Sequence, residues 1–281
     1  MARLTVAIPV YNGEENLEDC LNAILTQTFE DFIVKVYDNK STDRTAAIVS
    51  DIAKTDERVQ YFCNLENIGA SQNFLNSLAA ADTEFFVWRA DDDLSSQNYF
   101  QVLVELLEKS PGVALAVGHT ESHRLAKITK QYPYVGVNGE LQLFDILRKM
   151  FISSPAWIYG IWRTEQLQKY YLKSWKNYPV LWANDHLVIL NTILNKSIIG
   201  DNSATFIQRL GVRSRGTLSN LVKPTDEERF ENLFPMFLDH CMTILNQSKL
   251  KPFERNILRW LMPIYARKRV LGSKMLKLRH R

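Results

Sequence analysis

Residues 85–100 read FFVWRADDDLSSQNYF, an apolar run that ends in clustered carboxylates. Phe85–Trp88 has the composition of a buried strand, and after Arg89 and Ala90 come three consecutive aspartates, Asp91, Asp92 and Asp93. Three like charges within about 10 Å repel one another, and the repulsion grows as water is excluded. The cluster therefore indicates either a site for a divalent cation or an exposed acidic turn that caps the next helix.

Upstream of this stretch, strand-like and helical patterns alternate. Strands are predicted at 4–10, 32–37, 59–62 and 85–89. Helices are predicted around 17–25, from the capping residues at 41–43 through residue 52, and at 70–81. This alternation predicts a parallel, helix-covered sheet, in which ligands bind beyond the carboxyl ends of the strands. The polar clusters Tyr11-Asn12, Asp38-Asn39 and Asp91–Asp93 each follow a strand, so we expect them to meet at one edge of the sheet.

The second half of the chain has a weaker pattern. A helix is predicted at 98–109, a strand at 113–117 and a helix at 185–195, whereas residues 120–182 are rich in aromatic side chains and hard to assign. After Pro224 the pattern is helical at 226–247 and 253–271, and no further strand is predicted. The chain is therefore divided into a body, residues 1–220, and a helical extension, residues 221–281.

The bulk composition is that of a folded globular protein. Apolar residues make up 46% of the chain and charged residues 23%, and no apolar run is long enough to predict a transmembrane helix. Cys20, Cys63 and Cys241 are widely separated, which indicates reduced thiols and neither a disulfide framework nor a zinc site. Because the N-terminus also lacks the pattern of a secretory signal, we expect a cytoplasmic protein.

The net charge of +3 is unevenly distributed. Residues 249–281 contain eleven Lys and Arg against one acid, Glu254, so this segment carries +10 and the preceding residues carry −7. A basic segment that also contains Trp260 and Ile264 can lie on an anionic membrane, or it can pack on the body with a solvated basic end. Nucleic acid is not expected as a partner, since no recognised nucleic-acid module accompanies the segment.

Five segments occur in the order typical of one enzyme family: TVAIPVYNGEENL, VYDNKSTDRT, NIGASQN, WRADDD and WANDHLVIL. Over roughly residues 3–220 the chain resembles family 2 glycosyltransferases with the GT-A fold, an α/β, Rossmann-like, mostly parallel sheet flanked by helices. The resemblance implies transfer of a sugar from a nucleotide-diphosphate-sugar donor of UDP, dTDP or GDP type to an acceptor hydroxyl, with inversion. It also implies a nucleotide-sugar-binding part at 1–118, an acceptor-binding part at 119–220, and the helical, basic extension at 221–281.

The resemblance assigns the aspartates to the donor diphosphate. Negative charge grows on the diphosphate as its bond to the sugar breaks, and Mg²⁺ or Mn²⁺ held by carboxylates neutralises that charge. Asp91 and Asp92 match the last two positions of the family's Asp-any-Asp-Asp signature, where they would contact metal, diphosphate and ribose, with Asp93 as a substitute metal ligand. Arg89 replaces the first aspartate of the signature and would contact the donor or pair with an aspartate.

Other segments match loops that hold the nucleotide in this family. The matching positions are Pro9, Tyr11 and Asn12 in the first loop, Asp38 and Asn39 beside the base, Gly69 and Asn73 on the donor side, and Arg213 and Arg215 over the diphosphate. Asn39 stands in place of a carboxylate, and since an amide both donates and accepts, the identity of the base stays open. Two arginines can clamp a diphosphate by charge. Taken alone, each segment is also compatible with an ordinary turn, helix start or solvated basic loop.

An inverting transfer needs one base on the acceptor side, because the attacking hydroxyl must lose its proton. The family's acidic pair at the start of a helix is matched by Asn184-Asp185, which makes Asp185 the candidate base. Aspartate at a helix start is also a common capping residue. Trp182 is a candidate for stacking on a sugar, and His186 is expected to be structural and not a metal ligand.

The implied function is that of a metal-dependent hexosyl- or glycosyltransferase in cell-surface polysaccharide synthesis. Its acceptor would be a glycan or lipid-linked glycan, and it would act in the cytoplasm or on the cytoplasmic face of a membrane. Because Arg89, Asn39 and Asn184 depart from the family pattern, the alternative is a catalytically silent sugar-nucleotide-binding or scaffold protein of the same fold. A nucleotidyltransferase or an NAD-type dehydrogenase would need a glycine-rich loop after the first strand, which PVYNGEEN does not provide.

Overall fold

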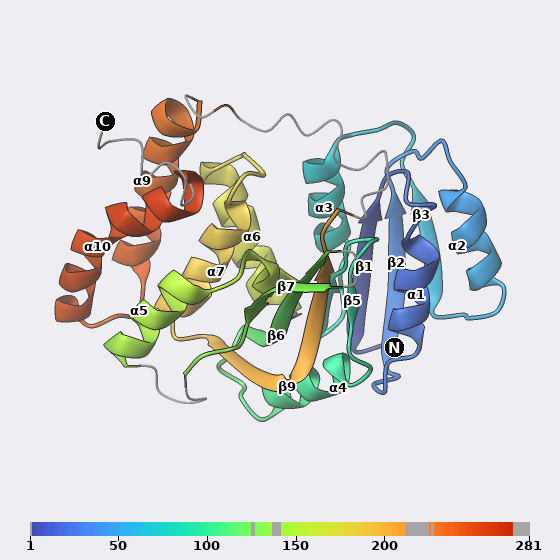
Figure 1. Ribbon diagram of the computed structural model, residues 1–281, viewed down its shortest axis with the longest axis horizontal. Coiled ribbons are helices and arrows are strands. Elements are labelled where there is room, and N and C mark those ends of the chain that lie inside the picture. Colours follow the sequence, from blue (N-terminus) through green and yellow to red (C-terminus); the bar gives the residue numbers. More distant parts are fainter. Residues whose placement is uncertain (1, 125–126, 137–141, 212–224, 226–227, 272–281) are drawn as a thin grey trace.

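The computed structural model describes residues 2–124, 127–136, 142–211, 225 and 228–271. Within this part of the chain, one mixed sheet forms the centre and helices cover it (Figure 1). The strands are β1 (Leu4–Val10), β2 (Phe32–Asp38), β3 (Val59–Cys63), β4 (Phe85–Trp88), β5 (Leu94–Ser95), β6 (Leu115–Arg124), β7 (Lys127–Tyr132), β8 (Ile161–Arg163) and β9 (Ile198–Arg209). Their order is β3-β2-β1-β4-β8-β6-β9-β5, with β7 paired to β6.

Helices connect these strands and then continue beyond the last one. They are α1 (Leu17–Leu25), α2 (Thr45–Ala53), α3 (Ala70–Ala79), α4 (Tyr99–Glu108), α5 (Leu143–Ile152), η1 (Pro155–Tyr159), α6 (Thr164–Asn177), α7 (Asn184–Leu194), η2 (Arg229–Leu233), α9 (Phe234–Gln247) and α10 (Pro252–Leu271). In the described part of the chain, no helix is both long and apolar enough to cross a membrane.

The first half of the sheet is parallel, as predicted. Strands β3, β2, β1 and β4 pair in parallel, and every residue of β1 and β4 is buried. Side chains alternate between the two faces, so Phe85 and Val87 join the core beneath α1 and α4, whereas Phe86 and Trp88 join the core shared with α3, α6 and α7. Two-sided burial explains why these strands are continuous apolar runs.

The second half of the sheet is mixed and was only partly predicted. Strand β9 pairs in parallel with β6, while β8 is antiparallel to both β4 and β6. Strand β9 was not predicted, because the polar triplet Asp201–Ser203 interrupts its apolar pattern like a turn. Its register against β6 shifts at Gly118, where an added Cβ would lie against the carbonyl oxygen of Ala204.

The predicted helical extension is present. Helices α9 and α10 pack against each other and lie over α7, at the end of the molecule away from α2 (Figure 1). The α/β class of the fold is therefore confirmed, together with the C-terminal helices. The division between residues 118 and 119 stays a prediction, and strand β6 runs across it.

Candidate active site

Two neighbouring cavities lie at the carboxyl ends of β1 and β4, and they share Pro9, Ala70 and Phe74 as a common wall. The first, here called the acidic cavity, has a volume of about 310 Å³ and is lined by Asp91, Asp92, Asn184 and Asp185. The second, the asparagine cavity, has a volume of about 370 Å³ and is lined by Asn39, Asn67 and Asn73. The convergence predicted from the strand ends is therefore found in part, since Tyr11, Asn39, Asp91 and Asp92 line the two cavities.

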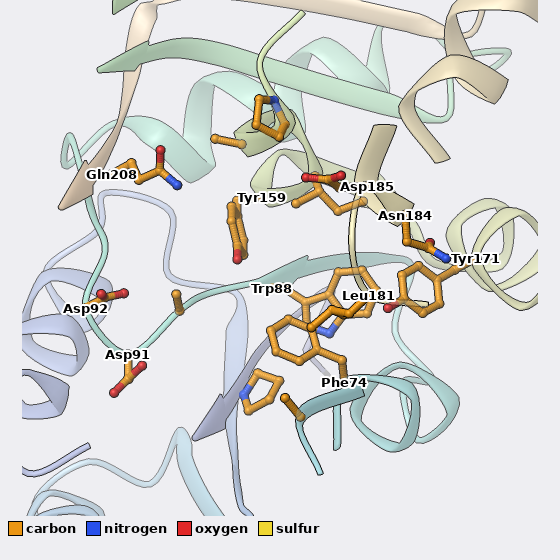
Figure 2. A pocket seen from close by; sticks show the side chains of 16 residues that line it. Phe74, Trp88, Asp91, Asp92, Tyr159, Tyr171, Leu181, Asn184, Asp185 and Gln208 are labelled. Carbon is orange, nitrogen blue, oxygen red and sulfur yellow. The ribbon is translucent and has the colours of Figure 1, made fainter. Parts of the chain in front are cut away.

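The acidic cavity has carboxylates on two sides. Figure 2 shows Asp91 and Asp92 on the turn after β4, and Asp185 across the cavity at the start of α7. Aromatic and apolar side chains form the wall between them: Phe74, Trp88, Tyr159, Tyr171 and Leu181. The arrangement encloses a space with an apolar lining and acidic groups at two ends, as ligand sites with a few placed polar groups commonly do.

The three aspartates have different surroundings. Asp91 is nearly buried and lies against Gly13, where an added Cβ would come within 2.9 Å of the Asp91 Oδ2 atom. Asp92 is half-buried, and its carbonyl oxygen accepts a hydrogen bond from the Arg209 Nε atom. Asp93 lines neither cavity: its Oδ1 atom accepts a hydrogen bond of 3.0 Å from the Arg209 backbone N–H. Burial, with the charge of Asp92 beside it, raises the pKa of Asp93 well above its usual range.

Asp91 and Asp92 line the acidic cavity as two carboxylates, the ligand type that Mg²⁺ and Mn²⁺ prefer. Such ions prefer oxygen ligands and often use only one or two protein carboxylates, with waters and substrate phosphates completing the shell. A group of three or more His, Cys, Asp or Glu suited to a metal does not occur among the described residues. The structure is thus compatible with a cation that donor phosphates help to hold, and not with an all-protein cage in the described chain.

Arg89 is turned away from both cavities. Its side chain is 1% exposed, and the guanidinium carbon lies 4.7 Å from the ring centroid of Tyr99 and 5.1 Å from that of Phe206. The Nη1 atom donates a hydrogen bond of 2.9 Å to the carbonyl oxygen of Tyr159. Arg89 lines neither cavity, which does not favour the predicted contact with the donor. It supports the turn that carries Tyr159, whose ring stacks on Phe206 at 5.2 Å and lines the acidic cavity.

Five of the predicted nucleotide contacts line the asparagine cavity: Pro9, Tyr11, Asn39, Gly69 and Asn73. The amide of Asn39 is already engaged, since it donates to Asn67 at 2.8 Å and accepts from Asn64 at 3.0 Å. Gly69 has a φ of +82°, a conformation that favours glycine, and its N–H donates to the Asn67 side chain. The asparagines thus hold the 64–69 loop in place beside the cavity.

Two other predicted contacts, Asn12 and Asp38, line neither cavity. Asp38 is 1% exposed, and its carboxylate accepts hydrogen bonds of 2.5 Å from the Ser41 hydroxyl and 2.5 Å from the Tyr61 hydroxyl. The Asn12 side chain accepts a hydrogen bond of 2.8 Å from the Thr42 backbone N–H. Both residues shape the loop at 38–45. Arg213 and Arg215 lie outside the described residues.

Asp185 stands at the first turn of α7. The chain enters this helix through Ala183, which has a left-handed φ of 63°, and the Asp185 Oδ1 atom accepts a hydrogen bond of 2.8 Å from the His186 N–H. Burial raises the pKa of Asp185 to about 6, partly opposed by that hydrogen bond and by the charge of Arg269. Asn184 is buried, and its amide donates to the Tyr178 carbonyl oxygen at 3.0 Å, so it anchors the helix start.

The neighbours of Asp185 differ in part from expectation. Trp182, predicted to stack on a sugar, is absent from the lining of both cavities: its Nε1 atom donates to the Val270 carbonyl oxygen at 3.2 Å. His186 is buried, which lowers its pKa well below the usual range, and its carbonyl oxygen accepts a hydrogen bond of 3.1 Å from the Tyr265 hydroxyl. Helix α10 therefore supports the segment that carries Asp185.

Sequence reasoning missed most of the aromatic wall. Tyr159 comes from η1 and Tyr171 from α6, both inside the aromatic stretch that could not be assigned to elements. Trp88 was predicted only as a strand residue, and Gln208 lies on the unpredicted strand β9. The density of aromatic residues between 120 and 182 was the only signal for this wall.

Comparison with known proteins agrees with this geometry. The family model described as "Glycosyl transferase family 2" matches residues 5–173, more than half of the chain. The GalNAc(5)-diNAcBac-PP-undecaprenol beta-1,3-glucosyltransferase of Campylobacter jejuni is 25% identical over 189 residues, which cover 66% of this chain and 60% of that protein. Glycosyltransferase GlyA of Streptococcus pneumoniae is 32% identical over 101 residues, 36% of this chain and 14% of that protein. The chain thus spans 60% or less of the length of these relatives.

Solved structures confirm the predicted GT-A type of fold. S. aureus TarS 1-349 in complex with UDP-GlcNAc has a TM-score of 0.71 and 18% identity, covering 100% of this chain and 77% of that chain. The mannosyltransferase PcManGT from Pyrobaculum calidifontis, in complex with GDP-Man and Mn²⁺, has a TM-score of 0.56 and 17% identity, covering 94% of this chain and 72% of that chain.

Proposed function

The chain belongs to glycosyl transferase family 2, and we propose that it transfers a sugar, with inversion, from a nucleotide-diphosphate-sugar to an acceptor hydroxyl. One observation carries this proposal. The acidic cavity holds the Asp91–Asp92 pair on one side and Asp185 on the other (Figure 2). It adjoins the asparagine cavity, with which it shares Pro9, Ala70 and Phe74. A donor laid across both cavities would place its diphosphate beside the pair and its sugar before Asp185.

The proposed roles follow from this placement. The nucleotide occupies the asparagine cavity, where Tyr11 and Asn73 contact it, and the diphosphate lies near Asp91 and Asp92. A bound Mg²⁺ or Mn²⁺ would neutralise the negative charge that develops on the leaving diphosphate. The aromatic wall of Trp88, Tyr159 and Tyr171 packs on the sugar and excludes water from it.

Asp185 is the proposed base. The acceptor oxygen forms a bond to the anomeric carbon from the side opposite the diphosphate, the bond between that carbon and the diphosphate oxygen breaks, and the hydroxyl proton passes to the Asp185 carboxylate. Because burial raises the pKa of Asp185 to about 6, the carboxylate is ionised at neutral pH yet more basic than an exposed aspartate. A pKa just below the working pH suits a general base.

The donor and acceptor classes rest on relatives. TarS is described in complex with UDP-GlcNAc, and the Campylobacter jejuni enzyme is named for an undecaprenol-linked acceptor. We infer a UDP-, dTDP- or GDP-sugar as donor and a glycan or lipid-linked glycan as acceptor, in the synthesis of a cell-surface polysaccharide on the cytoplasmic side of a membrane. Metal dependence and contact with the membrane belong to the same proposal.

A thermal-shift panel of nucleotides and nucleotide-sugars, each with and without Mn²⁺, tests the proposal. A true donor at about a hundred times its Kd should stabilise the protein by about 2.7 kcal/mol. Stabilisation by one base class that depends on Mn²⁺ supports both the donor site and the aspartate pair. A flat panel contradicts the proposed donor site, whereas donor binding without turnover on any acceptor favours the catalytically silent alternative.

A further inference from the structure

We propose that the outward face of helix α10 is a docking surface for an anionic lipid bilayer. Four large apolar side chains on this helix are exposed and form what we call the outer stripe: Phe253 at 56%, Ile257 at 42%, Trp260 at 84% and Ile264 at 57%. They follow one another at spacings of four, three and four residues, so they lie on one face of the helix. This proposal names the surface for the membrane contact that is part of the proposed function, and it can be tested independently of the transfer reaction.

Helix α10 has a second apolar face that accounts for its folding. Leu258, Met262 and Tyr265 are fully buried against the rest of the protein, and the helix packs on α9 and α5. The outer stripe is therefore not needed for the core. Contiguous exposed apolar surface of this kind marks an interaction site, and a tryptophan among such residues is typical of a membrane–water interface.

The charges on α10 indicate which partner covers the stripe. The helix carries four basic residues that can face a lipid surface, Arg255, Arg259, Arg267 and Lys268. A fifth, Arg269, lies on the inner side, where it donates to the carbonyl oxygens of Met150 and Ser153. The single acid of the helix, Glu254, is buried, lies 3.4 Å from the Lys196 Nζ atom and accepts a hydrogen bond of 2.7 Å from the Lys251 N–H. In sequence, four more basic residues and no acid follow the helix. Basic residues beside an apolar face favour an anionic lipid surface, to which each contributes about 1 kcal/mol.

The same charges disfavour a second copy of the chain as the partner. Two copies that met through the outer stripe would bring two cationic helices together, and like charges across an interface are costly. The position of the helix also suits a membrane-linked acceptor. Tyr265 and Val270 on its inner side hold the backbone of His186 and the indole of Trp182, so the stripe lies across α10 from the segment that carries Asp185.

Sedimentation with lipid vesicles tests the surface. The full chain is mixed with vesicles of phosphatidylcholine alone or of phosphatidylcholine and phosphatidylglycerol in equal parts, and the pelleted fraction is measured. We expect binding only to the anionic vesicles, weakened by high salt. The double variant Trp260→Ser, Ile264→Ser should bind at least about tenfold more weakly, since two apolar side chains no longer insert. Arg259→Glu should weaken binding severalfold through its reversed charge.

A matched control separates the stripe from exposed apolar residues in general. Leu65 is 96% exposed and follows β3, at the end of the sheet order away from α10, so Leu65→Ser should bind like the natural chain. The proposal is overturned by equal binding to both vesicle types, or by a double variant that binds as well as the natural chain. It is also overturned if the natural chain binds no lipid but forms a dimer that the double substitution disrupts. Donor-induced thermal shifts in the double variant should be unchanged. A chain that binds vesicles but no donor would remove the proposed function and leave this surface standing.

Discussion

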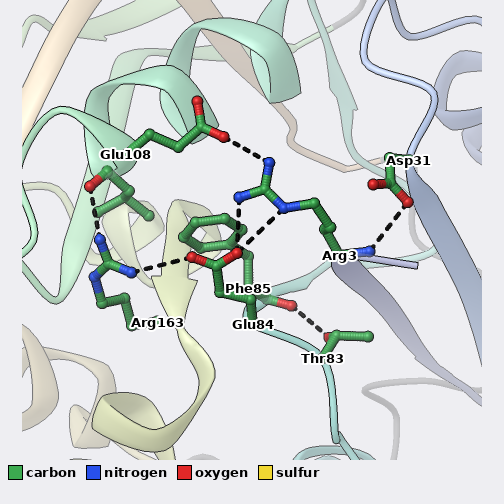
Figure 3. Close-up of polar contacts among 8 residues, drawn as sticks. Arg3, Asp31, Thr83, Glu84, Phe85, Glu108 and Arg163 are labelled. Atoms are coloured by element: carbon green, nitrogen blue, oxygen red, sulfur yellow. Dashed lines mark hydrogen bonds and ion pairs between the residues drawn. The ribbon is translucent and has the colours of Figure 1, made fainter. Parts of the chain in front are cut away.

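Charged groups gather at both edges of the parallel half-sheet, but they are paired with opposite charges at one edge and buried as carboxylates at the other. At the amino edge, Arg3 lies between two carboxylates, 2.7 Å from Glu84 and 2.5 Å from Glu108 (Figure 3). Arg163 approaches Glu84 from the other side at 3.4 Å, and both guanidinium groups lie against the ring of Phe85, at 5.4 and 5.5 Å from its centroid. The two guanidinium groups of Arg3 and Arg163 are thus paired with the carboxylates of Glu84 and Glu108.

The carboxyl edge keeps carboxylates where burial disfavours their charge. Burial raises the pKa of Asp93 and of Asp185, whereas hydrogen bonds to Glu84 and Glu108 raise the pKa of Arg3 and so favour its charged form. A buried carboxylate with a raised pKa is typical of a functional site, and a matched ion network is typical of structure. The comparison predicts that substitutions at the carboxyl edge change activity and that substitutions at the amino edge change only stability.

The largest expected effect is that of Asp185→Asn. The amide cannot take a proton from the acceptor, so kcat should fall by about 10³-fold or more, while donor-induced thermal stabilisation is retained. Steady-state transfer rates and thermal shifts measure the two quantities. The amino-edge variant Glu84→Gln, which also replaces a carboxylate by an amide, should transfer at the natural rate. Transfer by Asp185→Asn within a few-fold of the natural chain would remove Asp185 from the role of base.

Asp92→Ala should come next. Loss of one carboxylate of the pair is expected to remove the Mn²⁺-dependent part of donor stabilisation and to lower kcat/KM by about a hundredfold. Asp82→Ala serves as the control, because Asp82 precedes β4 at the amino edge and lines neither the acidic nor the asparagine cavity. If Asp92→Ala and Asp82→Ala respond to Mn²⁺ alike, the pair does not hold a cation.

The pH dependence sharpens the comparison further. Since the pKa of Asp185 is about 6, kcat/KM should fall about tenfold for each pH unit below that value. The free energy of unfolding changes in the opposite sense, because the folded state binds the Asp185 proton more tightly than the unfolded state does. This group therefore adds stability as pH falls from about 6 toward 3.8, the ordinary pKa of an aspartate, and that stability is lost as pH rises again. Urea unfolding of the natural chain and of Asp185→Asn across this range should show the difference, and parallel curves would contradict it.

Gly13→Ala tests whether the position of Asp91 matters. The added Cβ would lie 2.9 Å from the Asp91 Oδ2 atom and 2.5 Å from a Val10 methyl group, so the carboxylate must shift. Donor affinity, measured by isothermal titration with Mn²⁺ present, should fall about tenfold. Gly112→Ala is the matched control, because its Cβ would meet nothing within 4 Å. Equal affinities in the two variants would show that Asp91 does not set the donor site.

The smallest effect is expected at the amino edge. Glu84→Gln removes the ion pair between Glu84 and Arg3, whose side chains are 45% and 37% exposed. Ion pairs this exposed contribute about 1 kcal/mol or less to stability. Urea unfolding should therefore show a small loss of stability that shrinks at high salt. A loss of donor binding in this variant would break the comparison between the two edges.

Local patterns were enough to predict the parallel half of the sheet. The runs LTVAIPV and FFVW must be buried on both faces, and helices between parallel strands bring all carboxyl ends to one edge. The strands of the mixed half could not be predicted from local patterns in the same way. Strand β9 carries polar residues in its middle, and its place beside β6 depends on a register shift that no local period reveals.

The sequence by itself determined the family, the α/β class and the convergence of the polar clusters that follow β1, β2 and β4 at one edge of the sheet, because burial and chain connectivity act through local patterns. Asp185 was assigned only by resemblance to the family. Only the tertiary structure decided which polar side chains line the cavities and which support them. Arg89 turns inward because the carbonyl oxygen of Tyr159, seventy residues later, accepts its hydrogen bond. Asp38 turns inward because Tyr61 from the neighbouring strand reaches it. The direction in which a charged side chain points is set by its hydrogen-bond partners, and distant segments supply those partners only when the chain has folded.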